Sequence, residues 1–246
     1  RPDPPSLAES GAIVRLRLFA VPDHETKAVI EALVRQTHHF YASQYALPPG
    51  WSLLDLKASW PVHPELLSRL MENWSSLAGF EGLRGTLHFV ATVVHHLREV
   101  QDGDPLVQPG SVVLTASPTR TLLDQYLPQE WQVVINSEIE GPRSTAGDLD
   151  GGASANPQDG LTQRIARTIF LASAPNPHDH PRSVDRAHLL AGSVPPDGSI
   201  DVFDVSLEAF ESNARYLRHG GPWYWFETHP ADSTGHRKRD RNRHGT

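Results

Sequence analysis

The stretch "SWPVHPELLSRLMENW" (Ser59–Trp74) is followed closely by "FEGLRGTLHFVATVVHHL" (Phe80–Leu97), and these two stretches decide the predicted fold. Apolar residues recur in both at the spacing of one helical face, which predicts two amphipathic helices. These residues are Leu66, Leu67, Leu70, Met71, Trp74 and Leu77 in the first helix, and Leu87, Val90, Val94 and Leu97 in the second. His63 or the residue before it caps the first helix, and Pro64 fits its first turn. We therefore predict a helical hairpin whose facing stripes are buried.

One arginine, Arg84, stands at the start of the second helix in "GLRGTL". A helix N-terminus offers unpaired N–H groups and a positive dipole end to an anion. An arginine at this place adds a fork that can grip phosphate oxygens. The alternative is a structural ion pair with a nearby acid such as Glu81. The residues alone leave both interpretations open.

The composition is that of a globular chain with extensive loops. Its 246 residues are 38% apolar and 21% charged, with 21 Pro and 18 Gly, enough for one large domain or two small ones. No run of eighteen apolar residues occurs, so we expect no membrane span. The absence of cysteine excludes disulfides, zinc–thiolate sites and cysteine nucleophiles, and favours a cytoplasmic location. We expect no signal peptide in "RPDPPSLAES", and a fragment or processed chain because no Met begins it.

Charge is unevenly distributed along the chain. The net charge is −7, but the segment "HRKRDRNRH" near the C-terminus carries +4, so the remainder is near −11. We expect a basic flexible tail over residues 229–246. The alternative is a tail that touches nucleic acid or phosphate. The acidic remainder argues against a broad nucleic-acid-binding face, so any such binding is expected to be weak.

The first half of the chain is predicted to continue as helices. Asp23 is a plausible N-cap of a long helix that ends before "LPPG". "SVVLTAS" fits a short strand or an extended link, and Ser117 is a candidate cap for the helix "PTRTLLDQYL". "WQVVINSEI" is ambiguous between a strand and a buried helical turn. The segment 141–157 is small, polar and Gly-rich, which predicts a loop or linker.

The last part of the chain has the element order of a winged-helix module. Three helices are predicted in "LTQRIARTIFLASA", in "SVDRAHLLAGSV" with Ser183 as its cap, and in "DVSLEAFESNARYL". "YLRHGGPWYWFET" then predicts a β-hairpin that turns at Gly220–Gly221. Three helices followed by a hairpin are typical of a helix-turn-helix with a β-hairpin wing.

Most motifs that carry chemistry are missing from the chain. It contains neither G-x-x-x-x-G-K-[ST] nor a G-x-G-x-x-G after a strand, so no nucleotide cradle is visible. It also contains no G-x-S-x-G elbow. Glu138 and Glu140 could form a carboxylate pair on a strand, but solvated acids are expected. His178 and His180 could bind a metal in a loop, whereas surface histidines are the expectation.

The quoted helical stretches, with "ARTIFLASAP" and "YLRHGGPWYWFET", resemble a family. The chain is similar, from Val14 to Thr228, to the C-terminal half of PglY-like bacterial AAA+-type ATPases of phage-defence islands. These proteins carry a domain of unknown function. The resemblance implies a helical lid over about 12–140 and a winged-helix-like domain over 158–228. It also implies that an upstream domain binds most of the ATP and Mg²⁺.

The resemblance gives Arg84 a role, because it matches the second arginine of the family pattern "RTRG". It implies a sensor-2 arginine that reaches the γ-phosphate from the lid and stabilises charge during phosphoryl transfer. The first arginine of that pattern is Gly82 here. The expected partners are the upstream domain and further copies of the same protein, and the chain alone is expected to be an inactive ATPase. The alternative is a non-enzymatic winged-helix module that binds DNA or protein.

Overall fold

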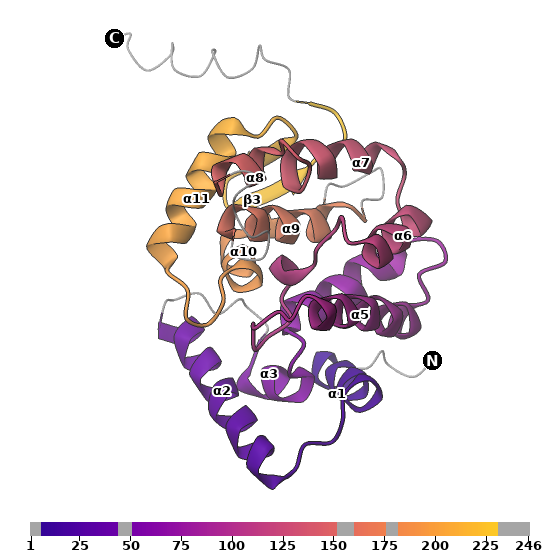
Figure 1. The fold of residues 1–246 in the computed structure, drawn as a ribbon, viewed down its shortest axis with the longest axis vertical. Helices are drawn as coiled ribbons and strands as arrows, with labels where there is room; N and C mark the ends of the chain where they lie inside the picture. Colours follow the sequence, from indigo (N-terminus) through magenta and orange to yellow (C-terminus); the bar gives the residue numbers. More distant parts are fainter. Residues whose placement is uncertain (1–5, 44–50, 152–159, 176–181, 231–246) are drawn as a thin grey trace.

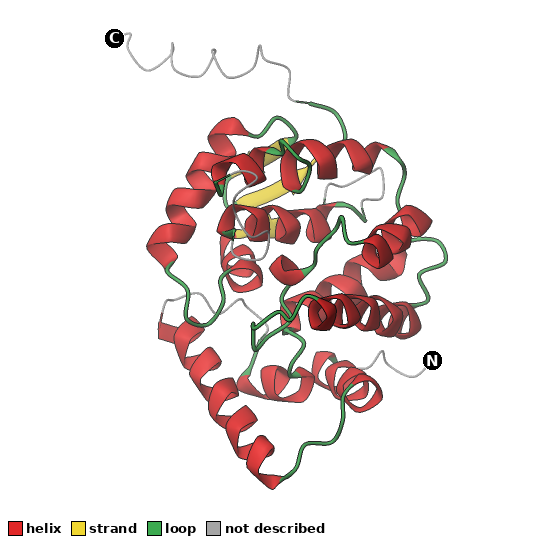
Figure 2. Ribbon diagram, viewed as in Figure 1, coloured by secondary structure: helices red, strands yellow, loops and turns green. Residues whose placement is uncertain are grey.

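The computed structural model describes residues 6–43, 51–151, 160–175 and 182–230. They form a mostly helical protein with a small three-stranded antiparallel sheet, so the prediction of a mostly α fold is confirmed (Figures 1 and 2). The helices of the first 99 residues are α1 (Leu7–Leu18), α2 (His24–Ser43), α3 (Leu53–Ser59), α4 (Pro64–Ser68) and α5 (Gly82–Glu99). No helix within the described ranges combines the length and apolarity needed to cross a membrane.

The first helices begin at capping residues that bind the free N–H groups of the first turn. Ser6 and Glu9 form a reciprocal capping box at the start of α1. Asp23 Oδ1 accepts a hydrogen bond from the Thr26 N–H at 2.7 Å, which confirms Asp23 as the cap of α2. His63 Nδ1 accepts from the Glu65 N–H at 3.1 Å, so the predicted histidine cap of α4 is confirmed.

The predicted helical hairpin is present, although its first arm changes its winding. After α4 the chain continues as a π-helical turn, η1 (Arg69–Asn73), and a 3₁₀ turn, η2 (Trp74–Ser76), before α5. Trp74 is fully buried, and its indole N–H donates to the carbonyl oxygen of Leu171 at 2.8 Å. On α5 the buried stripe differs from the predicted one, because Phe89 and Val93 are buried while Leu87 and Val94 are only partly buried.

The middle of the chain corrects several expectations. Its elements are η3 (Pro109–Ser111), α6 (Ser117–Tyr126), α7 (Glu130–Val134), the π-helical turn η4 (Ile135–Ile139) and α8 (Thr145–Leu149). The sequence left two segments open between alternatives: "SVVLTAS" is a link and not a strand, and "WQVVINSEI" is helical and not a strand. Ser117 is the first residue of α6 and not its cap. The helix α8 occupies part of the predicted loop 141–157, where Ser144 caps it by accepting from the Gly147 N–H at 3.2 Å.

The C-terminal part consists of α9 (Leu161–Ser173), β1 (Val184–Asp185), α10 (Arg186–Ser193), α11 (Ile200–Asn213), β2 (Leu217–Gly220) and β3 (Trp223–Phe226). The sheet order is β1-β3-β2, and both pairings are antiparallel. Gly221 has a φ of +60° in the predicted hairpin turn, a conformation that glycine adopts without strain. The predicted cap Ser183 is wrong, since Asp185 accepts from the N–H groups of Ala187 and His188.

The helix α9 lies at the centre of the molecule (Figure 1). Every residue from Thr162 to Ser173 is buried, and α9 packs against η3, α8, α10, α11 and β3. One cluster of buried apolar side chains extends from Val14 to Phe226, and a smaller cluster joins α2 and α3. The segments predicted as lid and winged-helix-like domain therefore share one core, and α9, the first helix of the second segment, is enclosed in it.

Candidate functional site

Arg84 lies in the first turn of α5, as predicted, with its side chain 84% exposed. Gly82 begins the helix with a φ of +47°, and Glu81 stands at the cap position without a side-chain capping bond. Arg84 Nη1 donates to Glu81 Oε2 at 2.8 Å, and the Glu81 side chain is 63% exposed. In this structure Arg84 therefore forms the ion pair with Glu81, which was the alternative to binding phosphate.

A shallow depression of about 340 Å³ lies beside this ion pair. Its lining comes from the turn before α5, from the first two turns of α5 and from the end of α6. The residues are Gly79, Glu81, Arg84, Gly85, His88, Gln125 and Tyr126. Tyr126 in this lining contacts the buried Phe80 ring edge to face, with centroids 5.3 Å apart. Arg84 thus lines a hollow that is also lined by the imidazole of His88 and the amide of Gln125.

The local chemistry of this hollow combines attraction and repulsion for an anion. The N–H groups of Arg84 and Gly85 already donate to the Glu81 carbonyl oxygen at 3.0 and 3.4 Å, and the Glu81 carboxylate adds a negative charge. An ion pair this exposed contributes only about 0–1 kcal/mol, because water screens it and both side chains lose freedom. A phosphate group that approaches Arg84 can therefore compete with Glu81 at small cost.

Glu138 and Glu140 do not form a pair of solvated acids, and this expectation is wrong. The chain is a π-helical turn here, and both side chains are buried. Glu138 Oε1 accepts from the N–H groups of Arg215 and Tyr216 at 2.8 and 3.1 Å, which ties η4 to the segment before β2. Both carboxylates therefore connect segments distant in sequence.

Arg167 on α9 is the buried partner of Glu140 and was missed by the sequence analysis. It is 1% exposed, and its Nε donates to Glu140 Oε1 while its Nη1 donates to the Gly110 carbonyl oxygen at 3.0 Å. Glu140 also accepts from the N–H groups of Leu114 and Thr115. The pair therefore joins α9, η4 and the segment after η3 inside the core.

Arg164, one turn earlier on α9, is the second buried arginine that sequence reasoning missed. Its three nitrogens donate to the Ser193 carbonyl oxygen at 2.7 Å, to Asp104 at 2.7 Å and to Gln108 at 2.8 Å. Gln108 in turn donates to the Tyr41 hydroxyl at 3.1 Å. The sequence gives no clear signal for this role, because α9 also contains Thr162, Gln163 and Thr168 and its apolar residues fit a helix with one buried face. Only the structure shows that both arginines are buried and therefore need partners.

His63 is fully buried beside Tyr41 and Trp51, with ring centroids 5.6 and 4.6 Å away. Burial lowers the pKa of His63 to about 3, so the imidazole is neutral near pH 7. Its Nε2 and the Oε2 of buried Glu65 have no hydrogen-bond partner among the described residues. A neutral, enclosed imidazole that caps a helix is a structural group and not a proton carrier at neutral pH.

The remaining histidine expectations concern metal binding. His178, His180 and the basic segment after residue 230 lie outside the described residues. Within the described ranges, no group of three or more His, Asp or Glu side chains is arranged to hold a metal ion. His95 faces solvent and lies 3.4 Å from Glu99 on the same helix.

Comparisons of this chain with protein-family models, curated proteins and solved structures find no match. The support for a function therefore comes from Arg84, from the order of the elements and from the resemblance in the sequence.

Proposed function

We propose that this chain is the C-terminal helical lid and winged-helix module of an AAA+-type ATPase of the PglY-like kind, with a role in bacterial phage defence. The winged-helix part of the proposal is supported by the order of elements from α9 to β3. A helix, a short strand, two helices and a hairpin follow one another, and the last strand, β3, pairs with both β1 and β2. A wing appended to a helix-turn-helix has this order.

The observation that carries the nucleotide-facing role is the exposure of Arg84 at the start of α5. The side chain is 84% exposed beside a hollow, and its ion-pair partner, Glu81, is also largely exposed. A preorganised cation that meets a transferring phosphate accelerates phosphoryl transfer, because it stabilises charge that develops in the transition state. In the proposal, ATP and Mg²⁺ bind mainly to an upstream domain, and Arg84 exchanges Glu81 for the γ-phosphate when the lid closes.

The test is an Arg84→Ala substitution in the full-length protein, with ATP turnover and thermal unfolding measured on the same sample. We expect turnover to fall about 10²–10³-fold, with a loss of unfolding free energy below about 1 kcal/mol because the side chain is exposed. Arg98→Ala is the matched control, since Arg98 is an exposed arginine on the last turn of the same helix. It lies roughly 20 Å from Arg84 along the helix axis.

Near-normal turnover per folded molecule in the Arg84→Ala protein would refute the nucleotide-facing role. An equal loss of turnover in Arg98→Ala would also refute it, because the effect would then belong to the helix and not to the site. A full-length protein without a phosphate-binding loop upstream of this chain would refute the whole ATPase proposal.

A non-enzymatic winged-helix module is the second candidate, and one observation favours a protein partner over DNA for it. In a helix-turn-helix the second helix, here α11, would meet the phosphates of DNA. The exposed face of α11 carries Asp201, Asp204 and Glu208, which repel phosphates. A filter-binding assay with duplex DNA at several salt concentrations is the test. We expect no DNA binding through α11, and binding through this helix would favour DNA over a protein as the partner.

A further inference from the structure

The helix α11 presents an outer face on which apolar and acidic side chains are both exposed. Val202 and Val205 are 53% and 69% exposed. Asp201, Asp204 and Glu208 are exposed beside them, and the helix contains no basic residue. Asp204 takes part in an ion pair, whereas Asp201 and Glu208 form none with any residue that the structure describes. We call the surface formed by Asp201, Val202, Val205 and Glu208 the α11 face.

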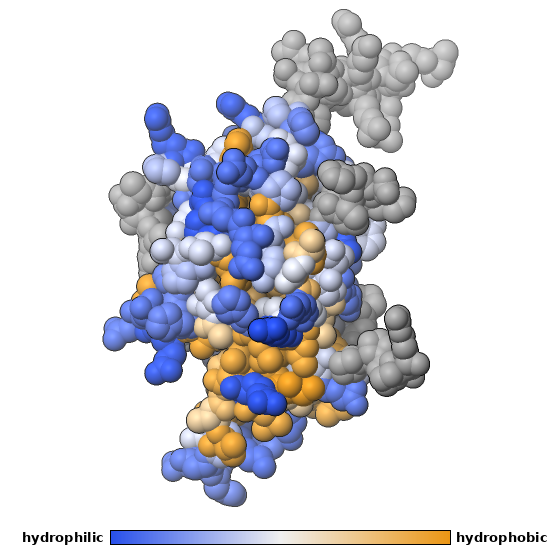
Figure 3. All heavy atoms as spheres, turned by 90° about the vertical axis from the view of Figure 1, so that its right-hand side faces the viewer, coloured by the Kyte–Doolittle hydropathy of each residue, from blue (hydrophilic) through white to orange (hydrophobic). Residues whose placement is uncertain are grey.

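A second exposed apolar surface has the opposite charge. Figure 3 shows hydrophobic surface gathered on the lower part of the side of the molecule that carries α1. On α1, Ile13 and Leu16 are 36% and 66% exposed, and the neighbouring Arg17 is exposed with them. A basic segment is repelled by this arginine, whereas the carboxylates of the α11 face attract it. Charge complementarity therefore favours the α11 face for a basic partner.

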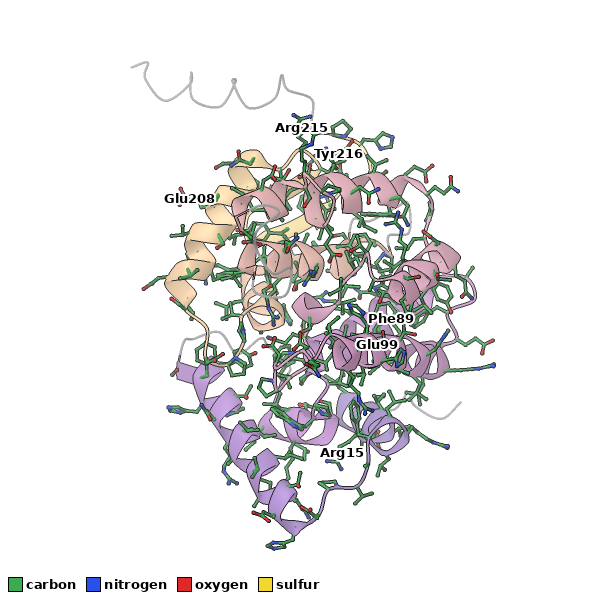
Figure 4. The ribbon with its side chains drawn as sticks, in the orientation of Figure 1. Arg15, Phe89, Glu99, Glu208, Arg215 and Tyr216 are labelled. Carbon is green, nitrogen blue, oxygen red and sulfur yellow. The ribbon has the colours of Figure 1, made fainter. Side chains whose placement is uncertain are left out.

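The chain leaves the described part of the molecule close to the end of α11. Arg218 donates to the carbonyl oxygen of His229 at 2.6 Å and, through its other terminal nitrogen, to that of Arg215 at 2.9 Å. Arg215 follows the last residue of α11 by two positions. Figure 4 shows Arg215 at the upper end of the molecule and Glu208 on the outer side of α11. The segment after residue 230 therefore starts near the α11 face.

The segment after residue 230 carries the charge that complements this face. Its stretch "HRKRDRNRH" has a net charge of +4, from five basic residues and one acid. The basic residues are Arg237, Lys238, Arg239, Arg241 and Arg243. Arginine suits such a contact, because its planar guanidinium group can donate two hydrogen bonds to one carboxylate.

The length of the segment allows it to reach this face on its own molecule. The seven residues from 231 to 237 can span about 23 Å when extended. The fourteen residues of α11 form a helix about 21 Å long. We propose that the basic stretch 237–243 binds the α11 face of the same chain, with its arginines on Asp201 and Glu208 and its aliphatic stems against Val202 and Val205.

This contact is a latch of modest strength. Each exposed ion pair contributes little, because water and salt screen it. The stretch nevertheless meets the face at an effective concentration on the order of millimolar, because a short linker joins them. The phosphate groups of nucleic acid then have to compete with Asp201 and Glu208 for the same arginines. The α11 face therefore lowers the affinity of the basic stretch for polyanions.

The first test is a zero-length cross-link, formed by a carbodiimide in the full chain and mapped by peptide mass spectrometry. The reagent joins an amine to a carboxylate that touches it, with loss of one water. Lys238 is the only lysine in the segment after residue 230, so its links are assigned without ambiguity. We expect a monomer in which Lys238 is joined to Asp201 or Glu208, in a yield that dilution does not change. Glu130 is the matched reference, because it is exposed on α7 at the same end of the molecule (Figure 1), and it should be joined far less.

The second test measures the competition with nucleic acid. Asp201→Asn combined with Glu208→Gln removes the charge of the α11 face. The control, Glu25→Gln combined with Glu130→Gln, removes the same charge from exposed positions on α2 and α7. If the latch is closed about nine tenths of the time, opening it raises the affinity for a short DNA duplex about tenfold. We therefore expect the α11 variant to bind the duplex about tenfold tighter than the control variant at the same salt concentration, with thermal unfolding showing that both variants are folded.

Several outcomes would overturn the proposal. Links from Lys238 to Glu130 that are as frequent as links to the α11 face would mean that the segment has no preferred site. Links found only in dimers would mean that the segment binds another copy and not its own molecule. Equal affinity of the α11 variant and the control variant for DNA would mean that the α11 face does not compete with phosphate. If a chain that ends at residue 230 binds DNA as tightly as the α11 variant, the basic stretch is not the binding element and the proposal fails.

Discussion

The buried ion pair between Arg167 and Glu140 allows a sharp prediction about stability. The two side chains are 1% and 3% exposed, so neither charge can be hydrated when its partner is removed. We expect Arg167→Met, which replaces the guanidinium by an apolar chain of similar length, to lower the free energy of unfolding by about 3–5 kcal/mol. For a chain of this size that is a decrease in Tm of roughly 6–20 °C.

The control is a second arginine–glutamate pair in the same chain. Arg84 and Glu81 are joined at 2.8 Å, much as Arg167 and Glu140 are, but their side chains are 84% and 63% exposed. We expect Arg84→Ala to cost less than about 1 kcal/mol, because water replaces the partner. Urea titrations of both variants at pH 7, followed by circular dichroism, give the two free energies. Equal losses would refute the argument that burial decides the value of the pair.

A double-mutant cycle separates the pair from its surroundings. Glu140→Gln keeps an oxygen that can accept from the N–H groups of Leu114 and Thr115, but it removes the charge. In the Arg167→Met background this substitution should therefore cost less than in the wild type, with a coupling free energy of about 1–3 kcal/mol. Additive losses would mean that the two side chains stabilise the fold independently.

Three further predictions concern pH, packing and nucleic acid. Burial lowers the pKa of His63 from 6.5 to about 3. As the pH falls below 6.5, the unfolded chain therefore binds the proton before the folded chain does. The stability that the neutral His63 contributes is complete above pH 6.5 and is lost as the pH falls. The expected slope is about 1.4 kcal/mol per pH unit at most, and urea titrations at pH 7 and pH 5 should show a smaller difference for His63→Asn, which keeps a capping acceptor. Gly110→Ala should lower the free energy of unfolding by roughly 1–3 kcal/mol, because the new Cβ would lie 2.9 Å from Arg164 Cβ, while Gly103→Ala, with no atom within 4 Å, should be nearly neutral. Weak binding of duplex DNA should fall steeply with salt and be absent from a chain that ends at residue 230, and salt-tolerant binding by that shorter chain would contradict the acidic assignment of α11.

Several elements could be predicted from the sequence because their causes are local. Asp23 and His63 cap helices by binding N–H groups three and two residues further on, and both appear in the sequence as capping patterns. The hairpin turns at Gly221, where a positive φ requires glycine. The periodic apolar residues of α5 predicted a helix correctly. Which face of that helix is most buried depends on the elements that pack against it.

The candidate site shows the same division. The position of Arg84 in the first turn of α5 could be predicted from the spacing of the apolar residues. Its partner Glu81 could also be named, because it lies only three residues away in the sequence. Its exposure, and the hollow formed with the end of α6, required the tertiary structure.

Only the tertiary structure showed which of the other charged residues are buried and which partners they bind. Glu140 lies 27 residues from Arg167, and Asp104 lies 60 residues from Arg164, so no short pattern in the sequence links either pair. The helix α9 is buried on all sides because segments from both halves of the chain close around it, and its arginines are tolerated there because carboxylates and carbonyl oxygens arrive with those segments. Whether a charge faces water or the core depends on these distant segments, and for that reason the local sequence could propose helices and caps but could not assign Glu138, Glu140, Arg164 and Arg167 to the interior.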